Sequence, residues 1–169
     1  MFNIFEFTKR LLKKREVKNL LNEANSVCLE LSKDKLNHLE VCGYTYESDI
    51  AIRELGLDNE LVQQLVEDYV VQIIKAKPQF MTYLQKLQKS KQANLKLNYI
   101  PLRELAHKNL GVVKNLRIED AQKILLELKS SDDLEYISLC LKLLEACAIK
   151  LKPTCAYNTI ELIKVKSFL

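Results

Sequence analysis

Glycine and proline are scarce in this chain, with three of each among 169 residues. These residues begin and end most tight turns, so their scarcity disfavours a multi-stranded β-sandwich and favours long helices joined by short loops. Between residues 58 and 152, apolar residues recur at intervals of three and four, which is the spacing of one helix face. The sequence therefore predicts an all-α fold.

The predicted helices divide the chain into three parts. Residues 50–153 are expected to form an antiparallel four-helix bundle, in which Asp58 is an N-cap. Pro78 interrupts the pattern, and it either kinks the first long helix or separates two helices. Residues 1–49 are expected to form an N-terminal helical extension. Residues 154–169 are expected to form a C-terminal extension that packs on the bundle; their pattern fits a helix or a strand, and the context favours a helix.

The N-terminal extension contains a concentrated run of basic residues, KRLLKKREVK. Residues 3–14 are expected to form a short basic helix, followed by a second helical stretch within residues 16–40. The first helix either packs its Phe/Leu face on the domain, which we prefer, or lies on an anionic membrane surface. No apolar run reaches the length of a membrane-spanning helix, and no signal peptide is visible.

The cysteines fit a cytoplasmic protein, and the net charge is mild. A formal net charge of +4 does not require nucleic acid as a partner. Five cysteines, without CxxC spacing and beside apolar residues, are expected to be reduced thiols in the core. His38 and Cys42 lie one helical turn apart and could join Cys28 around a metal, but a fourth ligand is missing. We therefore expect neither a metal site nor a nucleic-acid partner, and we do not expect a membrane partner.

The segment RELAHKNLGVV, residues 103–113, places a histidine and a glycine one helical turn apart. At 100° per residue, four residues share one face of this helix: Arg103, His107, Gly111 and Lys114. The apolar stripe of the helix points away from that face. His107 is therefore expected to be exposed, with basic groups nearby and open space at Gly111.

This arrangement suits phosphoryl transfer. A neutral imidazole nitrogen can accept a phosphoryl group from an aspartyl phosphate, and nearby Lys or Arg side chains neutralise the charge that is transferred. A glycine costs the helix about 1 kcal/mol, and this cost has a reason if a partner protein approaches the imidazole there. Glu104 either orients the imidazole or is a solvated charge. His38 has no comparable setting and is expected to be a surface or interface residue.

The same segment resembles a box of a known family. LAHKNLGVVKNL is similar to the A-H-x-L-K-G-x-x-x-N-L-G box of histidine phosphotransfer (Hpt) domains. ELGLDNELVQQLVEDYV looks like the opening helices of that family, and IEDAQKILLEL looks like the helix that follows the box. The resemblance spans residues 50–152 and implies a four-helix bundle that carries a phosphoryl group in a two-component phosphorelay.

By this resemblance, His107 is the phosphorylated histidine, Gly111 is the glycine four positions later, and Asn115 and Leu116 are the trailing Asn-Leu pair. The chain would be a stoichiometric carrier and not a turnover enzyme. Its partners would be a response-regulator receiver domain, a hybrid histidine kinase, or both. The receiver would supply Mg²⁺, and the carrier would need no cofactor. Three isolated glycines form no Gly-rich nucleotide loop, so we do not expect self-phosphorylation.

Three positions depart from the family box. Asn109 replaces an apolar residue, Leu110 replaces the lysine that contacts the phosphoryl group, and Arg117 replaces the last glycine. Lys108 and Lys114 are the cations that could replace the lost charge. A second hypothesis is an inert helical module for receiver docking or dimerisation, in which Leu110 is exposed and makes a hydrophobic contact.

Overall fold

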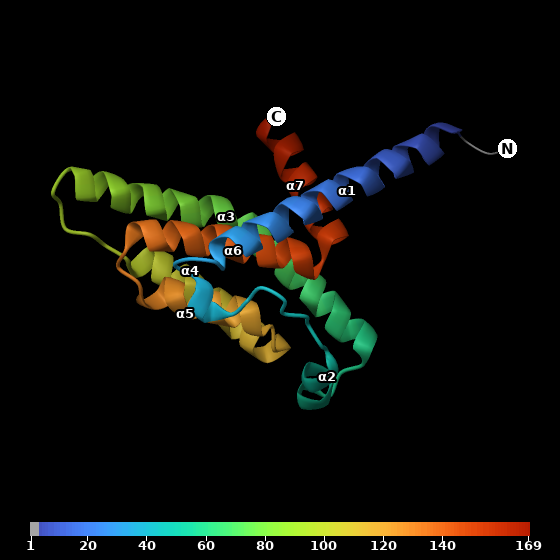
Figure 1. Ribbon diagram of the computed structural model, residues 1–169, viewed down its shortest axis with the longest axis horizontal. Helices are drawn as coiled ribbons and strands as arrows, with labels where there is room; N and C mark the ends of the chain where they lie inside the picture. The colour runs from blue at the N-terminus through green and yellow to red at the C-terminus, as the bar shows by residue number, and fades with distance from the viewer. Residues whose placement is uncertain (1–3) are drawn as a thin grey trace.

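The structure, a computed structural model, describes residues 4–169 (Figure 1). These residues form helices and connecting segments, and no strand occurs among them, which confirms the all-α prediction. The elements in chain order are α1 (Ile4–Leu31), the short 3₁₀ helix η1 (Asn37–Leu39), α2 (Asp49–Leu55), α3 (Asn59–Gln92), α4 (Ile100–Leu116), α5 (Glu119–Ser130), α6 (Leu134–Leu151) and α7 (Pro153–Ser167).

The contacts between helices define one packed body. α3 contacts α4 and α6, and α5 contacts the same two helices, so these four close a ring of contacts. α1 and α7 pack against α6 and against each other, and α7 also contacts α3. A single hydrophobic core runs from Ala24 in α1 to Ala156 in α7, so all three predicted parts of the chain contribute to it.

α6 lies at the centre of this packing. It contacts α1, α3, α5 and α7, and 10 of its 18 residues are buried. A helix that is apolar around most of its circumference is stable in water only when other helices cover it. Cys140 and Cys147 lie on this helix, and Cys28 of α1 is buried as well. All five thiols are free, but Cys42 is exposed, so the prediction that every cysteine lies in the core is wrong for that residue.

α3 continues through Pro78 as one helix of 34 residues, so a separation into two helices at this proline is wrong. A proline removes one backbone donor, but burial of one helix face can offset this loss. Buried residues on both sides of Pro78, such as Ile74 and Phe80, supply that packing. The predicted N-cap is confirmed, because the Asp58 carboxylate accepts a hydrogen bond of 2.8 Å from the backbone N–H of Leu61.

The two ends of the chain also differ from the expected boundaries. The separate stretches expected within residues 3–14 and 16–40 form one continuous helix, α1, which ends at Leu31. The C-terminal extension is helical, as the context favours, and Pro153 begins it because proline is well suited to a first helical turn. Within residues 4–169, no helix combines the length and the apolar character that crossing a membrane requires.

The Phe/Leu face of the first helical turns does not pack on the domain, so the preferred prediction is wrong. Leu11 is 49% exposed and Leu12 is 59% exposed. The reason is that α1 extends beyond the rest of the molecule toward its N-terminus (Figure 1). Its first half-buried residue is Val17, and every described residue before it is exposed.

Candidate functional site

His107 lies on the outer face of α4 and is exposed. The buried residues of this helix, among them Ala106 and Val113, follow the spacing of one face and point toward α3 and α5. Gly111 and Lys114 share the exposed face with His107. The predicted exposure of the imidazole is therefore confirmed.

Lys129 of α5 contacts the imidazole, and the sequence reasoning missed it. The chain reverses direction between α4 and α5, where Arg117 takes the left-handed conformation (φ 58°) and Ile118 donates its N–H to the Val113 carbonyl. This reversal brings Lys129 Nζ to 3.1 Å from His107 Nδ1. An ammonium group can only donate, so Nδ1 accepts, and the neutral ring then carries its proton on Nε2.

Nothing within the folded chain requires glycine at position 111. A Cβ atom built at this position meets no heavy atom within 4 Å, and the backbone is helical and not left-handed. Alanine would therefore fit and would favour the helix. On the neighbouring helix, Leu126 lies about one turn before Lys129 and is 42% exposed. We call the surface formed by the exposed residues His107, Gly111, Lys114 and Leu126 and the half-buried Lys129 the histidine face.

The two residues between His107 and Gly111 that depart from the family box are both structural. Leu110 is 3% exposed, so the prediction of an exposed leucine is wrong; α4 packs against both α3 and α5, and this edge of the helix is covered. Asn109 is 1% exposed, and its amide donates to the Leu105 carbonyl at 2.8 Å. Gln72 Nε2 of α3 donates to Asn109 Oδ1 at 2.7 Å, so both polar ends of this buried side chain have partners.

None of the other predicted basic residues forms a hydrogen bond with the imidazole among the described residues. Arg103 pairs with Asp132 at 2.5 Å, and its guanidinium lies 5.0 Å from the centre of the Tyr99 ring. These contacts hold the start of α4 against the loop before α6. Lys108 and Lys114 are exposed, and neither forms an ion pair within the part of the chain that the structure describes.

Glu104 is an exposed carboxylate on α4, and Lys129 is the residue that contacts the His107 ring. This arrangement fits the alternative in which Glu104 is a solvated charge. His38 is also on the surface, as expected. Its ring stacks on Tyr136 at 6.4 Å, and its Nε2 lies 3.9 Å from a carboxylate oxygen of Glu127.

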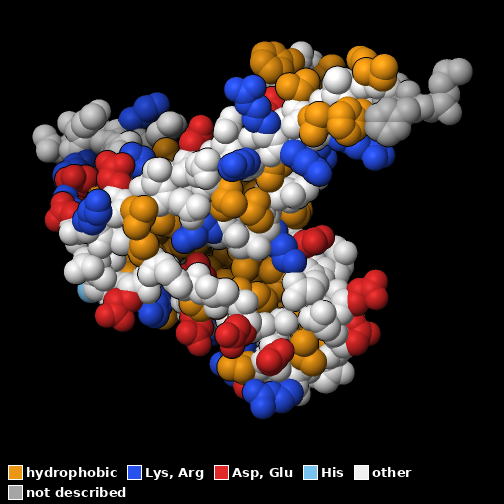
Figure 2. All heavy atoms as spheres, turned by 45° about the vertical axis from the view of Figure 1, so that its right-hand side comes forward, with side chains coloured by type: hydrophobic (Ala, Val, Ile, Leu, Met, Phe, Trp, Pro, Cys, Tyr) orange, Lys and Arg blue, Asp and Glu red, His pale blue; other side chains and the backbone are white. Residues whose placement is uncertain are grey.

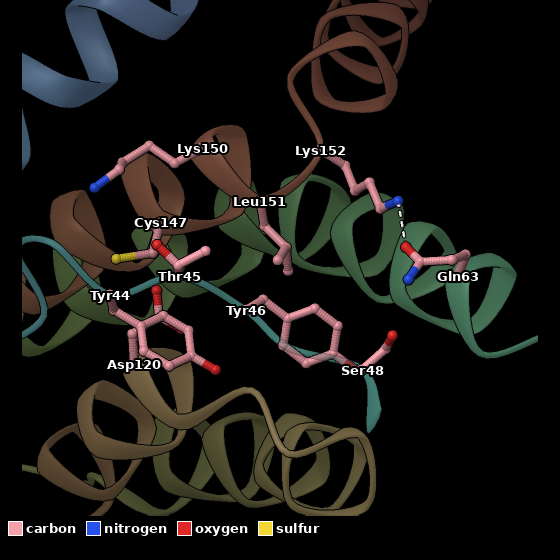
Figure 3. Close-up of a pocket in the computed structure, with 10 residues that line it drawn as sticks. All are labelled: Tyr44, Thr45, Tyr46, Ser48, Gln63, Asp120, Cys147, Lys150, Leu151 and Lys152. Atoms are coloured by element: carbon pink, nitrogen blue, oxygen red, sulfur yellow. Dashed lines mark hydrogen bonds between the residues drawn. The ribbon is translucent and has the colours of Figure 1, made fainter. Parts of the chain in front are cut away.

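A second candidate site is a cavity of about 330 Å³ near the reversal between α4 and α5 (Figure 3). We call it the tyrosine pocket, and the sequence predicted none of its lining residues as functional. Ten residues line it: Tyr44, Thr45, Tyr46, Ser48, Gln63, Asp120, Cys147, Lys150, Leu151 and Lys152. Figure 3 shows that the tyrosines come from the segment before α2, and the lysines come from the end of α6 and the residue after it.

The polar groups of the tyrosine pocket hold chain segments together. Tyr46 donates its hydroxyl to the Leu116 carbonyl at 2.8 Å, and Tyr44 Oη accepts the N–H of Glu119 at 3.1 Å. Burial raises the pKa of Tyr44 to about 12. Burial also raises the pKa of the Asp120 carboxyl, and the hydrogen bond from the Ala121 N–H opposes this effect. These contacts fix the segment before α2 over the α4–α5 reversal.

Comparisons with known proteins do not assign the chain to a family. The chain matches no protein-family model, no curated protein and no solved structure. Among residues 4–169, no three His, Cys, Asp or Glu side chains lie together as a metal site requires. A function must therefore be argued from the histidine face and the tyrosine pocket themselves.

Proposed function

We propose that α3, α4, α5 and α6 form an Hpt-like four-helix bundle and that His107 carries a phosphoryl group. The group would be exchanged with the aspartate of a receiver domain, which binds the Mg²⁺. One observation carries this proposal: an exposed imidazole has a lysine ammonium 3.1 Å from Nδ1 and an open glycine on the next helical turn. The closed ring of contacts among the four helices supports the bundle.

Lys129 supplies the positive charge that the departure at Leu110 removes. Leu110 is buried, so it does not reach the histidine face. Lys129 reaches the same imidazole from the neighbouring helix. A phosphoryl group in transfer spreads negative charge over its equatorial oxygens, and a fixed ammonium beside them stabilises that charge.

Arg117 replaces the last glycine of the family box but keeps the backbone conformation that such a glycine would adopt. It takes the left-handed conformation that ends α4, and glycine adopts this conformation most easily. A glycine at this position of the box has a backbone role, so its replacement does not remove a phosphate contact. The Arg117 side chain pairs with Glu54 of α2 at 2.6 Å, which holds α2 against the end of α4.

The transfer step requires a change in the Lys129 contact. In the resting arrangement, Nδ1 accepts from Lys129 and Nε2 carries the ring proton. The incoming phosphoryl oxygens compete for the ammonium and free Nδ1. The ring proton then moves to Nδ1 through solvent, and the Nε2 lone pair attacks phosphorus as its bond to the aspartate oxygen breaks. The aspartate leaves as a carboxylate, and phosphohistidine is formed.

The direct test is phosphorylation of the full chain with phosphoramidate, a small-molecule donor that needs no partner protein. We expect an acid-labile, base-stable phosphohistidine on the wild type and none on the His107→Ala variant. His38→Ala is the matched control, because His38 is the only other histidine and is also on the surface. Equal labelling of the wild type and His107→Ala would overturn the proposal.

A second candidate function is receiver docking without phosphorylation. The exposed leucine that motivated it in the sequence is buried, but Leu126 provides an exposed apolar group on the same face. The contact of Lys129 with Nδ1 also supports it, because the contact occupies one ring nitrogen. Under this hypothesis, a receiver domain binds His107→Ala as well as the wild type, while Gly111→Glu abolishes binding and no phosphohistidine forms on either chain.

A further inference from the structure

The first turns of α1 form an arm that extends from the packed body. Every described residue from Ile4 to Glu16 is exposed, and Glu16 lies where α1 meets α7. Figure 1 shows the arm on the side of the N-terminus, beyond the crossing with α7. The Tyr157 hydroxyl donates to the Glu16 carboxylate at this crossing, so α7 holds the base of the arm.

Over residues 4–13, the arm has one apolar face and one basic face, and Arg15 falls on the apolar side at the same spacing. At 100° per residue, its large apolar residues fall within an arc of about 160°. They are Ile4, Phe5, Phe7, Leu11 and Leu12. Ile4 is 71% exposed, and the two leucines are 49% and 59% exposed. Lys9, Arg10 and Lys13 lie on the opposite side of the helix, and Figure 2 shows hydrophobic and basic side chains gathered along the arm.

The charge of the whole chain is concentrated in this arm and its base. Residues 4–18 contain six of the 26 Lys and Arg residues and two of the 22 Asp and Glu residues. This stretch therefore carries a formal charge of +4, which equals the net charge of the entire chain, and the remaining residues balance to zero. The distribution favours an anionic partner for the arm and disfavours a second copy of this chain, because two such arms would repel each other.

We propose that the α1 arm binds the surface of an anionic lipid bilayer, lying in the interface with its apolar face down. A helix with Phe and Leu on one side and Lys and Arg on the other binds bilayers in this way, through apolar burial and attraction to anionic headgroups. The two packing partners of the base of the arm are α6 and α7, whereas the histidine face belongs to α4 and α5. The bilayer would therefore hold the protein while His107 stays accessible, and the proposal stands whether or not His107 is phosphorylated.

The test is co-sedimentation of the full chain with phosphatidylcholine vesicles that contain roughly 30% phosphatidylserine, at about 0.1 M salt. We expect binding that is lost on pure phosphatidylcholine vesicles and that weakens as salt is raised. Each basic residue near the surface contributes about fivefold to partitioning, so Lys13→Glu/Lys14→Glu should weaken binding by about 25-fold or more. Leu11→Ser/Leu12→Ser should also weaken it, because less apolar surface is buried.

The matched control is Lys89→Glu/Lys91→Glu, which changes the net charge equally at the far end of α3 (Figure 1). We expect it to bind vesicles like the wild type. Equal loss in both charge variants would overturn the proposal, because it would indicate non-specific attraction. Failure of the wild type to sediment would also overturn it, as would a concentration-dependent dimer that Leu11→Ser/Leu12→Ser dissociates. Labelling of the α1 variants by phosphoramidate tests phosphorylation of His107 independently of vesicle binding.

Discussion

The histidine face and the tyrosine pocket flank the same pair of helices, α4 and α5, but their polar groups differ in how they are used. In the pocket, the hydroxyls of Tyr44 and Tyr46 bond to backbone groups at the α4–α5 reversal. On the histidine face, Gly111 has open space above it, and the contact of Lys129 is with a ring nitrogen that can exchange partners. The tyrosine hydroxyls of the pocket thus have a stabilising role, whereas the histidine face presents a ring nitrogen and open space to a partner.

This difference has a general lesson for choosing a site. A cavity whose polar groups are satisfied by the chain gains nothing from a ligand unless those bonds are broken. A helix position that lowers stability without any internal reason indicates selection for something outside the chain. Substitutions on the histidine face should therefore change phosphorylation and not lower stability, and loss of a tyrosine hydroxyl in the pocket should do the opposite.

The largest expected effect follows from Lys129→Glu. A carboxylate beside His107 replaces an attraction for the phosphoryl group by a repulsion, so the rate of labelling by phosphoramidate should fall by about 10-fold to 100-fold. Lys123→Glu is the control, because Lys123 lies on the same helix and donates to the Leu39 carbonyl on another side. Labelling of Lys129→Glu at the wild-type rate would show that Lys129 does not assist phosphorylation of His107.

Tyr46→Phe tests the pocket. It removes the hydroxyl that bonds the Leu116 carbonyl at 2.8 Å, so the free energy of unfolding should fall by about 1 kcal/mol in urea denaturation. Labelling of His107 should be unchanged. Tyr83→Phe is the matched control, since its hydroxyl accepts only from Gln79 one turn away on the same helix and near solvent. If Tyr46→Phe lost labelling without losing stability, the tyrosine pocket would have a role in phosphorylation and not in stability.

Gly111→Ala should raise the free energy of unfolding by about 0.5–1 kcal/mol, because alanine favours the helix and meets no atom there. Gly56→Ala is the contrasting variant. Gly56 also has open space, but its φ is +64°, so alanine should lower stability at that position. A destabilised Gly111→Ala chain would show that Gly111 has an internal role after all.

The smallest effect concerns Asp120, whose raised pKa means that the folded state binds the proton more tightly than the unfolded state. Its contribution to stability is therefore present below the unfolded pKa and is lost as the pH rises through the folded pKa. Asp120→Asn should melt at a higher temperature than the wild type at pH 7, and the difference should shrink below about pH 4. Asp34→Asn, at an exposed turn, is the control.

Much of the helical architecture could be predicted from the sequence, because spacing and caps act locally. The continuity of α1 could not be predicted from the sequence. Its apolar residues change face between residues 4–12 and residues 17–31, which indicates two helices if both faces must pack on the same domain. Residues 4–16 are exposed, so the change of face requires no break. The burial of Leu110 also escaped prediction, because this residue lies at the edge of the helix face and the packing of the neighbouring helices determines whether it is covered.

Lys129 could have been found. In two antiparallel helices joined by a short reversal, residues equally far from the reversal lie side by side. His107 and Lys129 each lie 11 positions from Ile118, so the pairing follows once that residue is recognised as the turning point. Three residues other than glycine have a positive φ among residues 4–169: Glu40, Asn94 and Arg117. Turning points of this kind are hard to predict from sequence, because glycine is the residue expected at a positive φ.

The central position of α6 has a consequence for biosynthesis. Within residues 4–169 this helix follows α1, α3 and α5 in the order of synthesis, yet it covers apolar surfaces of all three. Until Leu151 has been synthesised, those surfaces have no permanent partner, and contacts between α1 and α6 join residues more than a hundred positions apart. The nascent chain should therefore depend on chaperones until α6 emerges, and a chain stopped before Leu134 should aggregate instead of folding.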